Sequence, residues 1–275
     1  MLLFRECCVW RIYRLKENRL RNLMRKGEPT IGTRVLMVWP GVTELIGYTG
    51  MYDYVEFLSE YGPYDLHDLD NFARAAELVG LSTMIKIDQE PRTYIAGRAL
   101  AAGIQNILFA DIRTADDAEE SVRAVRAEPE GISGYRMDRR VGYVGVTASK
   151  ADVVKMCEDA VIALMIEKKS AVENLEEILP VKGVDMVQFG PSDYSISIGL
   201  PGEADHPKVK EAELKTIKTA LKMDVAPRAE IGNPEGAKRY IEMGVRNFSL
   251  NTDVRILYDW WKKNGSELKR ILSSM

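Results

Sequence analysis

The chain has 275 residues, 46% of them hydrophobic, and can therefore bury one large core. Its net charge is −3 and it contains no long basic run, which argues against a nucleic-acid partner. No apolar run approaches the roughly 18 residues needed to span a membrane. Cys7, Cys8 and Cys157 are odd in number and unpatterned, so we expect a reducing compartment, the cytoplasm, without disulfides or a zinc site.

Residues 1–17 mix apolar side chains with arginines and lack the long apolar core of a secretory signal. We interpret them as a helical N-terminal extension of unassigned role, followed by a single domain over residues 18–275. A helix is expected at 18–26. Strands are then predicted at 33–39, 54–58, 83–87, 106–109, 161–166, 185–189, 226–231 and 247–250. Helices are predicted at 41–49, 66–79, 93–102, 115–127, 171–179, 206–223 and 234–243, and residues 254–273 are expected to form one or two further helices.

Eight strands that alternate with helices predict an α/β fold, a (β/α)₈ TIM barrel closed by C-terminal packing helices. A doubly wound open sheet is the alternative, but no G-x-G-x-x-G follows the first strand. Residues 128–149 form a long Gly-rich loop with three arginines, either a lid or subunit contact or a plain mobile insertion. Trp260 and Trp261 indicate a core or a subunit interface.

Two of the predicted strands end at carboxylates, Glu167 and Asp193, with one amphipathic helix between them. A right-handed βαβ unit places both strand ends on one rim, so these carboxylates should face each other there. Such a pair suits a hard cation such as Mg²⁺ or Mn²⁺, although acids at strand ends are also commonly helix caps or solvated charges. Gly190-Pro191-Ser192-Asp193 predicts a tight turn that approaches something closely.

Nearly the whole chain, from Asn18 onward, resembles the HpcH/HpaI class II aldolases, which are TIM barrels of the phosphoenolpyruvate/pyruvate superfamily. The resemblance lies in several short motifs: Asn18-Arg19-Leu20, Tyr52-Asp53-Tyr54-Val55, Ala115-Asp116-Asp117-Ala118, Glu167, Gly183-Val184-Asp185, Phe189-Gly190-Pro191-Ser192-Asp193-Tyr194-Ser195, His206-Pro207 and Ala237-Lys238-Arg239-Tyr240.

This resemblance implies a divalent metal held by Glu167 and Asp193, which chelates pyruvate or a related 2-oxo acid and stabilises its enolate. The substrate carboxylate is then expected at the backbone of Gly190, Pro191 and Ser192. The other implied partners are an aldehyde and, through the C-terminal helices, further copies of the chain in a homo-oligomer.

The chain departs from the family pattern where protons are handled. Tyr61 stands in place of the usual histidine, Lys86 in place of an arginine, Ala101 in place of an aspartate and Met165 in place of a glutamine. One hypothesis is that Tyr61 and Lys86 form a proton relay and oxyanion clamp, with the Lys86 cation lowering the pKa of Tyr61. The alternative is that Tyr61 only contacts a ligand, and Lys86 as a Schiff-base lysine is a further one.

Glu230 ends a strand at the same rim, where it indicates either a polar or cationic substrate group or a salt bridge with Arg228 or Lys86. The function we predict is a metal-dependent carbon–carbon lyase of the aldolase type that acts on a 2-oxo acid. The alternatives are a CoA-thioester lyase of the citrate-lyase β type, and a barrel that binds a metal and an oxo acid without turnover.

Overall fold

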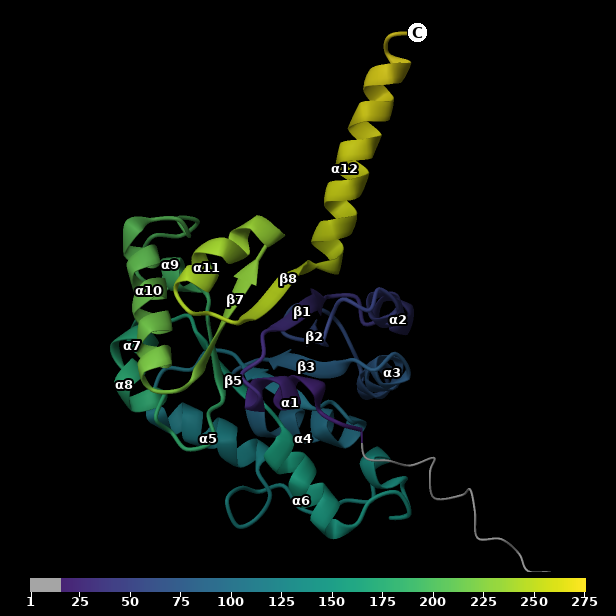
Figure 1. Cartoon of the computed structure of the whole chain (residues 1–275), viewed down its shortest axis with the longest axis vertical. Coiled ribbons are helices and arrows are strands. Elements are labelled where there is room, and N and C mark those ends of the chain that lie inside the picture. The colour runs from purple at the N-terminus through teal and green to yellow at the C-terminus, as the bar shows by residue number, and fades with distance from the viewer. Residues whose placement is uncertain (1–15) are drawn as a thin grey trace, which may run out of the picture.

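A computed structural model describes residues 16–275, and eight parallel strands in it close into one barrel in chain order (Figure 1). The predicted TIM-barrel fold is therefore confirmed. The proposed extension falls outside the described residues except for Lys16 and Glu17. The strands are β1 (Thr30–Val35), β2 (Tyr54–Leu58), β3 (Ser82–Ile87), β4 (Asn106–Phe109), β5 (Ile162–Ile166), β6 (Met186–Phe189), β7 (Ala226–Ile231) and β8 (Asn247–Thr252).

The first strand begins and ends earlier than predicted. Thr30 pairs with Asn247 of β8, which extends β1 backwards. At the other end, the N–H groups of Leu36 and Met37 donate to the Asp253 carboxylate at 2.9 and 3.0 Å, so the chain leaves the sheet there.

Most of the helices cover the outside of the barrel, and most match their predicted positions. They are α1 (Arg19–Arg25), α2 (Pro40–Tyr48), α3 (Leu66–Leu78), α4 (Arg92–Ala102), α5 (Ala115–Val125), α6 (Lys150–Asp159), α7 (Lys169–Glu173), α8 (Leu175–Ile178), α9 (Pro191–Ser197), α10 (Pro207–Lys222), α11 (Ala237–Glu242) and α12 (Asp253–Leu272). Short 3₁₀ helices lie at Arg139–Val141 and Pro234–Gly236.

Four of these helices correct the prediction. The expected helix at 171–179 is divided at Asn174 into α7 and α8. Helix α6 was missed, although Ser149 and Asp152 form a capping box that marks its start. The predicted turn at Gly190–Asp193 is wrong, because Pro191 begins α9, where its fixed φ suits a first helical residue.

Side chains alternate along each strand, so every second residue faces the barrel axis. The outward side chains, among them Phe57, Ile85 and Leu164, pack in the large cluster beneath the helices. The inward apolar side chains form a second cluster, which includes Met84 and Met165. Lys86 lies two residues after Met84 in β3, and Glu167 lies two residues after Met165, directly after β5. By the same alternation, both side chains face inward near the C-terminal ends of their strands.

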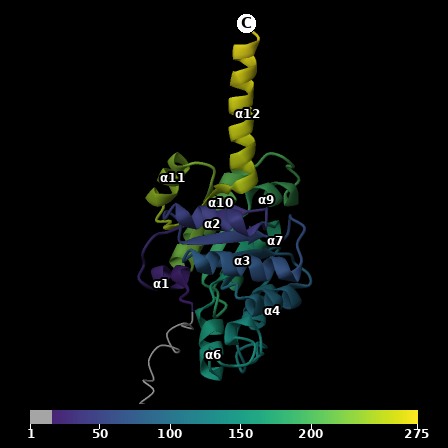
Figure 2. The ribbon, with the colours of Figure 1, turned by 90° about the vertical axis from the view of Figure 1, so that its right-hand side faces the viewer.

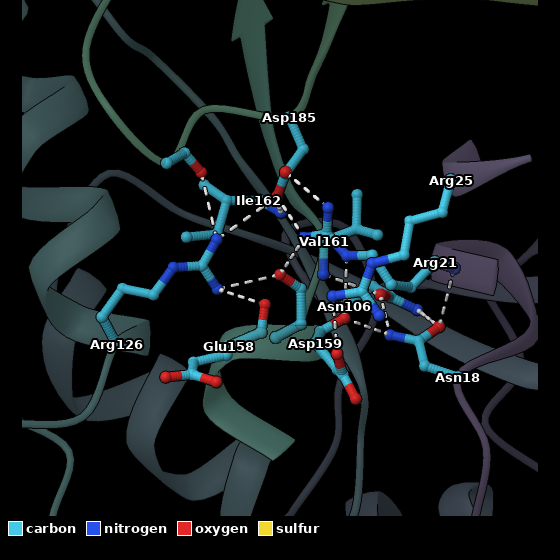
Figure 3. Close-up of polar contacts among 12 residues, drawn as sticks. Asn18, Arg21, Arg25, Asn106, Arg126, Glu158, Asp159, Val161, Ile162 and Asp185 are labelled. Carbon is cyan, nitrogen blue, oxygen red and sulfur yellow. Dashed lines mark hydrogen bonds and ion pairs between the residues drawn. The ribbon is translucent and has the colours of Figure 1, made fainter. Parts of the chain in front are cut away.

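The N-terminal end of the barrel is closed by a polar network (Figure 3). The Arg21 guanidinium of α1 donates to both Asp185 carboxylate oxygens, at 2.6 and 2.5 Å. Asn18 donates to Asn106 Oδ1 at 2.7 Å, and the same oxygen accepts from Val161 N at 2.9 Å. Because this end is sealed, the C-terminal ends of the strands form the open mouth of the barrel.

The loop at 128–149 lies between a helix and the next strand, so it belongs to the closed end of the barrel. Arg139 holds it there by donating to both Glu77 carboxylate oxygens of α3, at 2.7 and 2.6 Å. This position does not support the interpretation of the loop as a lid over the mouth.

Helix α12 leaves the mouth end and projects away from the barrel in two perpendicular views (Figures 1 and 2). Asp253 is its only buried residue, and Trp260 and Trp261 are each 62% exposed. The interpretation of these tryptophans as core residues is therefore wrong, and a subunit interface remains. Between residues 16 and 275, no helix has the length and apolar character to cross a membrane.

Candidate active site

Glu167 lies at the mouth of the barrel. It directly follows β5, whose last residue Ile166 pairs with Phe189 of β6, so Glu167 lies beside Gly190. The side chain is almost fully buried, at 2% exposure, and its Oε1 accepts from the N–H of Asp111 at 3.0 Å. A Cβ on residue 190 would lie 2.7 Å from Glu167 Cβ and 2.8 Å from Glu167 Oε2. Only glycine leaves room for the carboxylate in this position.

The groups around Glu167 have opposite effects on the pKa of its carboxyl group. Burial raises the pKa of its carboxyl group, and the negative charge of Asp193 adds to that effect. The Lys86 cation and the Asp111 N–H lower the pKa but do not cancel the increase. A cation that approaches Glu167 therefore stabilises the ionised form of this buried carboxyl group.

Asp193 is the third residue of α9, and its side chain is 45% exposed at the mouth. Lys168, which follows Glu167, places its Nζ 3.7 Å from Asp193 Oδ1 and 2.7 Å from Asp111 Oδ1. Both predicted metal ligands therefore lie on the rim, with a lysine and a third carboxylate beside them.

Tyr61 and Lys86 come together from neighbouring strands. The Tyr61 hydroxyl and Lys86 Nζ are 2.7 Å apart, and the ammonium also forms an ion pair with Glu60. Lys86 is buried, whereas Tyr61 is 56% exposed. The contact expected between Tyr61 and Lys86 is present.

The expected effect of Lys86 on the pKa of Tyr61 is not found. Burial raises the pKa of Tyr61 to about 12, and the Lys86 cation opposes this only in part. Burial alone would lower the pKa of Lys86, but Glu167, Tyr61 and Glu60 raise it above its ordinary value. Tyr61 and Lys86 therefore both keep their protons and can both donate hydrogen bonds to a substrate. The Schiff-base alternative is not supported, because a protonated lysine cannot attack a carbonyl as a nucleophile.

Glu230 forms neither of the salt bridges considered for it. Its carboxylate pairs with Arg34 of β1 and accepts from Gln188 Nε2 of β6 at 2.9 Å. Arg228 lies deeper in the barrel, where it pairs with Glu56 and both side chains are almost completely buried. Arg34, Gln188 and Glu230 thus form a polar wall from strands β1, β6 and β7.

The residues at 190–192 bind less through their backbone than the resemblance implies. The Gly190 N–H donates to the Ile166 carbonyl at 2.9 Å, and Pro191 has no N–H. Ser192 and Asp193 stand in the first turn of α9, where N–H groups find no carbonyl within the helix. They are the remaining backbone donors of this segment.

A divalent metal fits these residues in one respect, because the Glu167 carboxylate is buried and lies against a glycine at the mouth. Across residues 16–275, no group of three or more His, Cys, Asp or Glu side chains is arranged to hold a metal. The protein would therefore supply two carboxylates and leave the other positions to water and substrate, as is usual for Mg²⁺.

A cavity of about 670 Å³ lies elsewhere, at the closed end of the barrel. It is lined by residues such as Asn22, Arg74, Arg139 and Lys155, and by none of the candidate site residues. Its size does not make it the active site, because the carboxylates and the Lys86–Tyr61 pair meet at the other end.

The sequence reasoning missed Asp111, Lys168, Arg34 and Gln188. Asp111 could have been found, because it lies two residues after the end of β4 and so on the same rim as Glu167. Nothing local marks the other three, which are recognised only by the side chains they meet.

Comparisons with known proteins place this barrel. Residues 48–255 match the family model described as HpcH/HpaI aldolase/citrate lyase. The chain belongs to this family. The carbon–carbon lyase class predicted from the sequence is confirmed by this membership.

Among the relatives, the 4-hydroxy-2-oxo-heptane-1,7-dioate aldolase of Escherichia coli is 30% identical over 251 residues, covering 88% of this chain and 91% of the relative. The hydroxypyruvate/pyruvate aldolase of Delftia acidovorans is 28% identical and covers 88% of this chain and 89% of its own length. The crystal structure of an HpcH/HpaI aldolase from Desulfitobacterium hafniense superimposes with a TM-score of 0.85 at 25% identity, covering 92% of this chain and 97% of that one.

Proposed function

We propose that this family member is a divalent-metal-dependent aldolase that cleaves or forms a carbon–carbon bond next to a 2-oxo acid such as pyruvate. Glu167 and Asp193 would hold Mg²⁺ or Mn²⁺. The names of the relatives, two kinds of aldolase for oxo acids, support the reaction class. The observation that carries the proposal is the buried Glu167 carboxylate, fitted against Gly190 in the mouth with Lys86 and Tyr61 nearby.

A bound divalent metal supplies Lewis acidity to the keto oxygen of the substrate. The other roles belong to the chain. Lys86 keeps its proton, so its ammonium stabilises negative charge that develops on a substrate oxygen. Tyr61 also keeps its proton, so its hydroxyl donates to the oxygen of the aldehyde as the new bond forms.

The remaining groups of the mouth position the substrate. The N–H groups of Ser192 and Asp193 are suited to the carboxylate of the oxo acid. Glu230 is held by Arg34 and Gln188 and still reaches solvent, so this side suits a polar group on the aldehyde.

The test is the exchange of the pyruvate methyl protons with D₂O, followed by NMR in the presence of Mg²⁺ or Mn²⁺. The wild type should catalyse exchange, and Glu167→Gln, which keeps the shape but loses the charge, should abolish it. Lys86→Met should also slow exchange strongly. The control is Lys182→Met, which removes a lysine from a distant turn and should leave the rate unchanged.

Two results would contradict the proposal. Tight binding of oxalate and Mn²⁺ without any methyl exchange would indicate a barrel that binds an oxo acid and does not turn it over. Exchange that persists in Glu167→Gln would show that the chemistry does not depend on this carboxylate.

We also propose that the protein is a cytoplasmic homo-oligomer in which α12 packs on another copy. Leu257, Trp261, Leu268 and Leu272 share one face of this helix, and the last three are largely exposed. Apolar side chains grouped in this way usually mark an interface. Trp261→Glu should reduce the mass measured by light scattering, and an unchanged mass would contradict the assignment of this face.

A further inference from the structure

Asp111, which follows β4 on the rim, contacts both Glu167 and Lys168. Its backbone is left-handed, with φ of 55°, a conformation that aspartate and asparagine tolerate better than most residues. In this conformation its N–H donates to Glu167 Oε1 at 3.0 Å, while its carboxylate lies 2.7 Å from Lys168 Nζ. One residue therefore holds the candidate metal ligand Glu167 and the lysine next to it.

Lys168 lies between two carboxylates at unequal distances. Its ammonium is 2.7 Å from Asp111 Oδ1 and 3.7 Å from Asp193 Oδ1. The lysine side chain is 20% exposed, so its charge is only partly screened by solvent. Asp193 thus has a positive charge beside it before any metal is present, and that charge has a second, closer partner.

We propose that Lys168 and Asp111 form a charge-regulating pair that sets the affinity of the metal site formed by Glu167 and Asp193. This inference rests on the proposed function, because it assumes that these two carboxylates hold the metal. Lys168 neutralises part of the charge on Asp193 when the site has no divalent ion. Asp111 retains the ammonium when a divalent ion binds.

Electrostatics gives each member of the pair an opposite effect. The Lys168 cation repels a divalent ion at Asp193, so it weakens metal binding. Asp111 draws the ammonium away from Asp193, so it strengthens metal binding. A plain surface salt bridge would stabilise the fold slightly and leave metal affinity unchanged.

The test uses the full chain and Mn²⁺ alone, with free Mn²⁺ measured by electron paramagnetic resonance. Lys168→Met keeps the length of the side chain and removes the charge, and it should tighten Mn²⁺ binding about fivefold. Asp111→Asn keeps the left-handed backbone and the N–H to Glu167, and it should weaken Mn²⁺ binding about fivefold because Lys168 then has Asp193 alone. The double variant should behave like Lys168→Met, since the carboxylate of Asp111 acts only through the lysine.

The matched control is Lys169→Met. Lys169 is the next residue, is mostly exposed, and lies near Glu173 of its own helix. This variant changes the net charge by the same amount and should leave Mn²⁺ affinity unchanged. Urea unfolding of each variant shows whether its fold is intact.

Three outcomes would overturn the inference without contradicting the proposed metal site. In the first, both single variants change Mn²⁺ affinity in the same direction. In the second, Lys169→Met matches Lys168→Met, so that only net charge matters. In the third, the wild type binds Mn²⁺ and none of the variants differs from it, which leaves the proposed function intact. A wild type that binds no Mn²⁺ would overturn the proposed metal site as well.

Discussion

Replacing Gly190 by alanine tests the geometry of the candidate site directly. Gly190 has φ of −105° and ψ of 90°, which alanine can adopt, so the backbone itself is not strained by the change. The new methyl group would meet Glu167 Cβ at 2.7 Å, Glu167 Oε2 at 2.8 Å and Met165 Cε at 3.1 Å. The effect is therefore purely one of space.

The contacts give the size of the effect. The end of the Met165 side chain can move aside, but Glu167 Cβ is fixed by β5 and lies about 0.7 Å inside the 3.4 Å at which ordinary contact begins. Crowding of this kind costs about 1–3 kcal/mol of unfolding free energy. Metal sites tolerate shifts of only about 0.2 Å in their ligands, so we expect Mn²⁺ affinity to fall at least about tenfold.

Urea unfolding and Mn²⁺ binding measure the two effects on the same protein. Gly232→Ala is the control, since Gly232 follows β7 and nothing lies within 4 Å of a Cβ added there. It should change neither quantity. If Gly190→Ala retains both the stability and the Mn²⁺ affinity of the wild type, the carboxylate of Glu167 does not occupy the place described here.

Three further predictions concern the interior, the phenol and a helix cap. Glu56→Leu leaves Arg228 unpaired inside the barrel and should lower the free energy of unfolding in urea by about 3–5 kcal/mol. The double variant Glu56→Leu/Arg228→Met should recover most of this loss. An equal loss of stability in the single and double variants would contradict the prediction. Tyr61→Phe removes the hydroxyl that donates to the aldehyde oxygen, so it should slow the condensation of pyruvate with an aldehyde about 100-fold. Because the pKa of Tyr61 is about 12, the pH profiles of the two proteins should have the same shape between pH 7 and 10. Asp117 is partly buried, but two backbone N–H groups before α5 lower its pKa below the ordinary 3.8. Its ionised form therefore stabilises the fold, and Asp117→Asn should lower the free energy of unfolding by about 1 kcal/mol. This loss should be complete above pH 3.8 and should shrink at lower pH, where the carboxylate of the wild type becomes protonated. A loss independent of pH would refute the role of the charge.

The fold could be predicted from local patterns in the sequence. β2, β4 and β7 have the bounds expected for them, because each is a short run of strand-forming residues between polar or Gly-containing segments. Glu167 and Asp193 were placed on the rim because the direction of a parallel strand is known once the strand is known. The start of α6 was equally readable in its capping box.

Partners and environments could not be read in this way. Glu230 pairs with Arg34, Glu56 with Arg228, and Lys168 with Asp111, and in each pair the two residues are more than 50 positions apart in the chain. The high pKa of Tyr61 results from burial, which the Lys86 cation opposes only in part.

The sequence by itself thus determined the barrel, the order of its strands and the two acids at its mouth. These features follow from periodicity and chain direction, which act over a few residues. Only the tertiary structure decided which charges meet, which are removed from water, and that α12 stands away from the barrel. Those outcomes depend on the closure of the sheet and on burial, which bring distant segments together and have no counterpart in any single stretch of the chain.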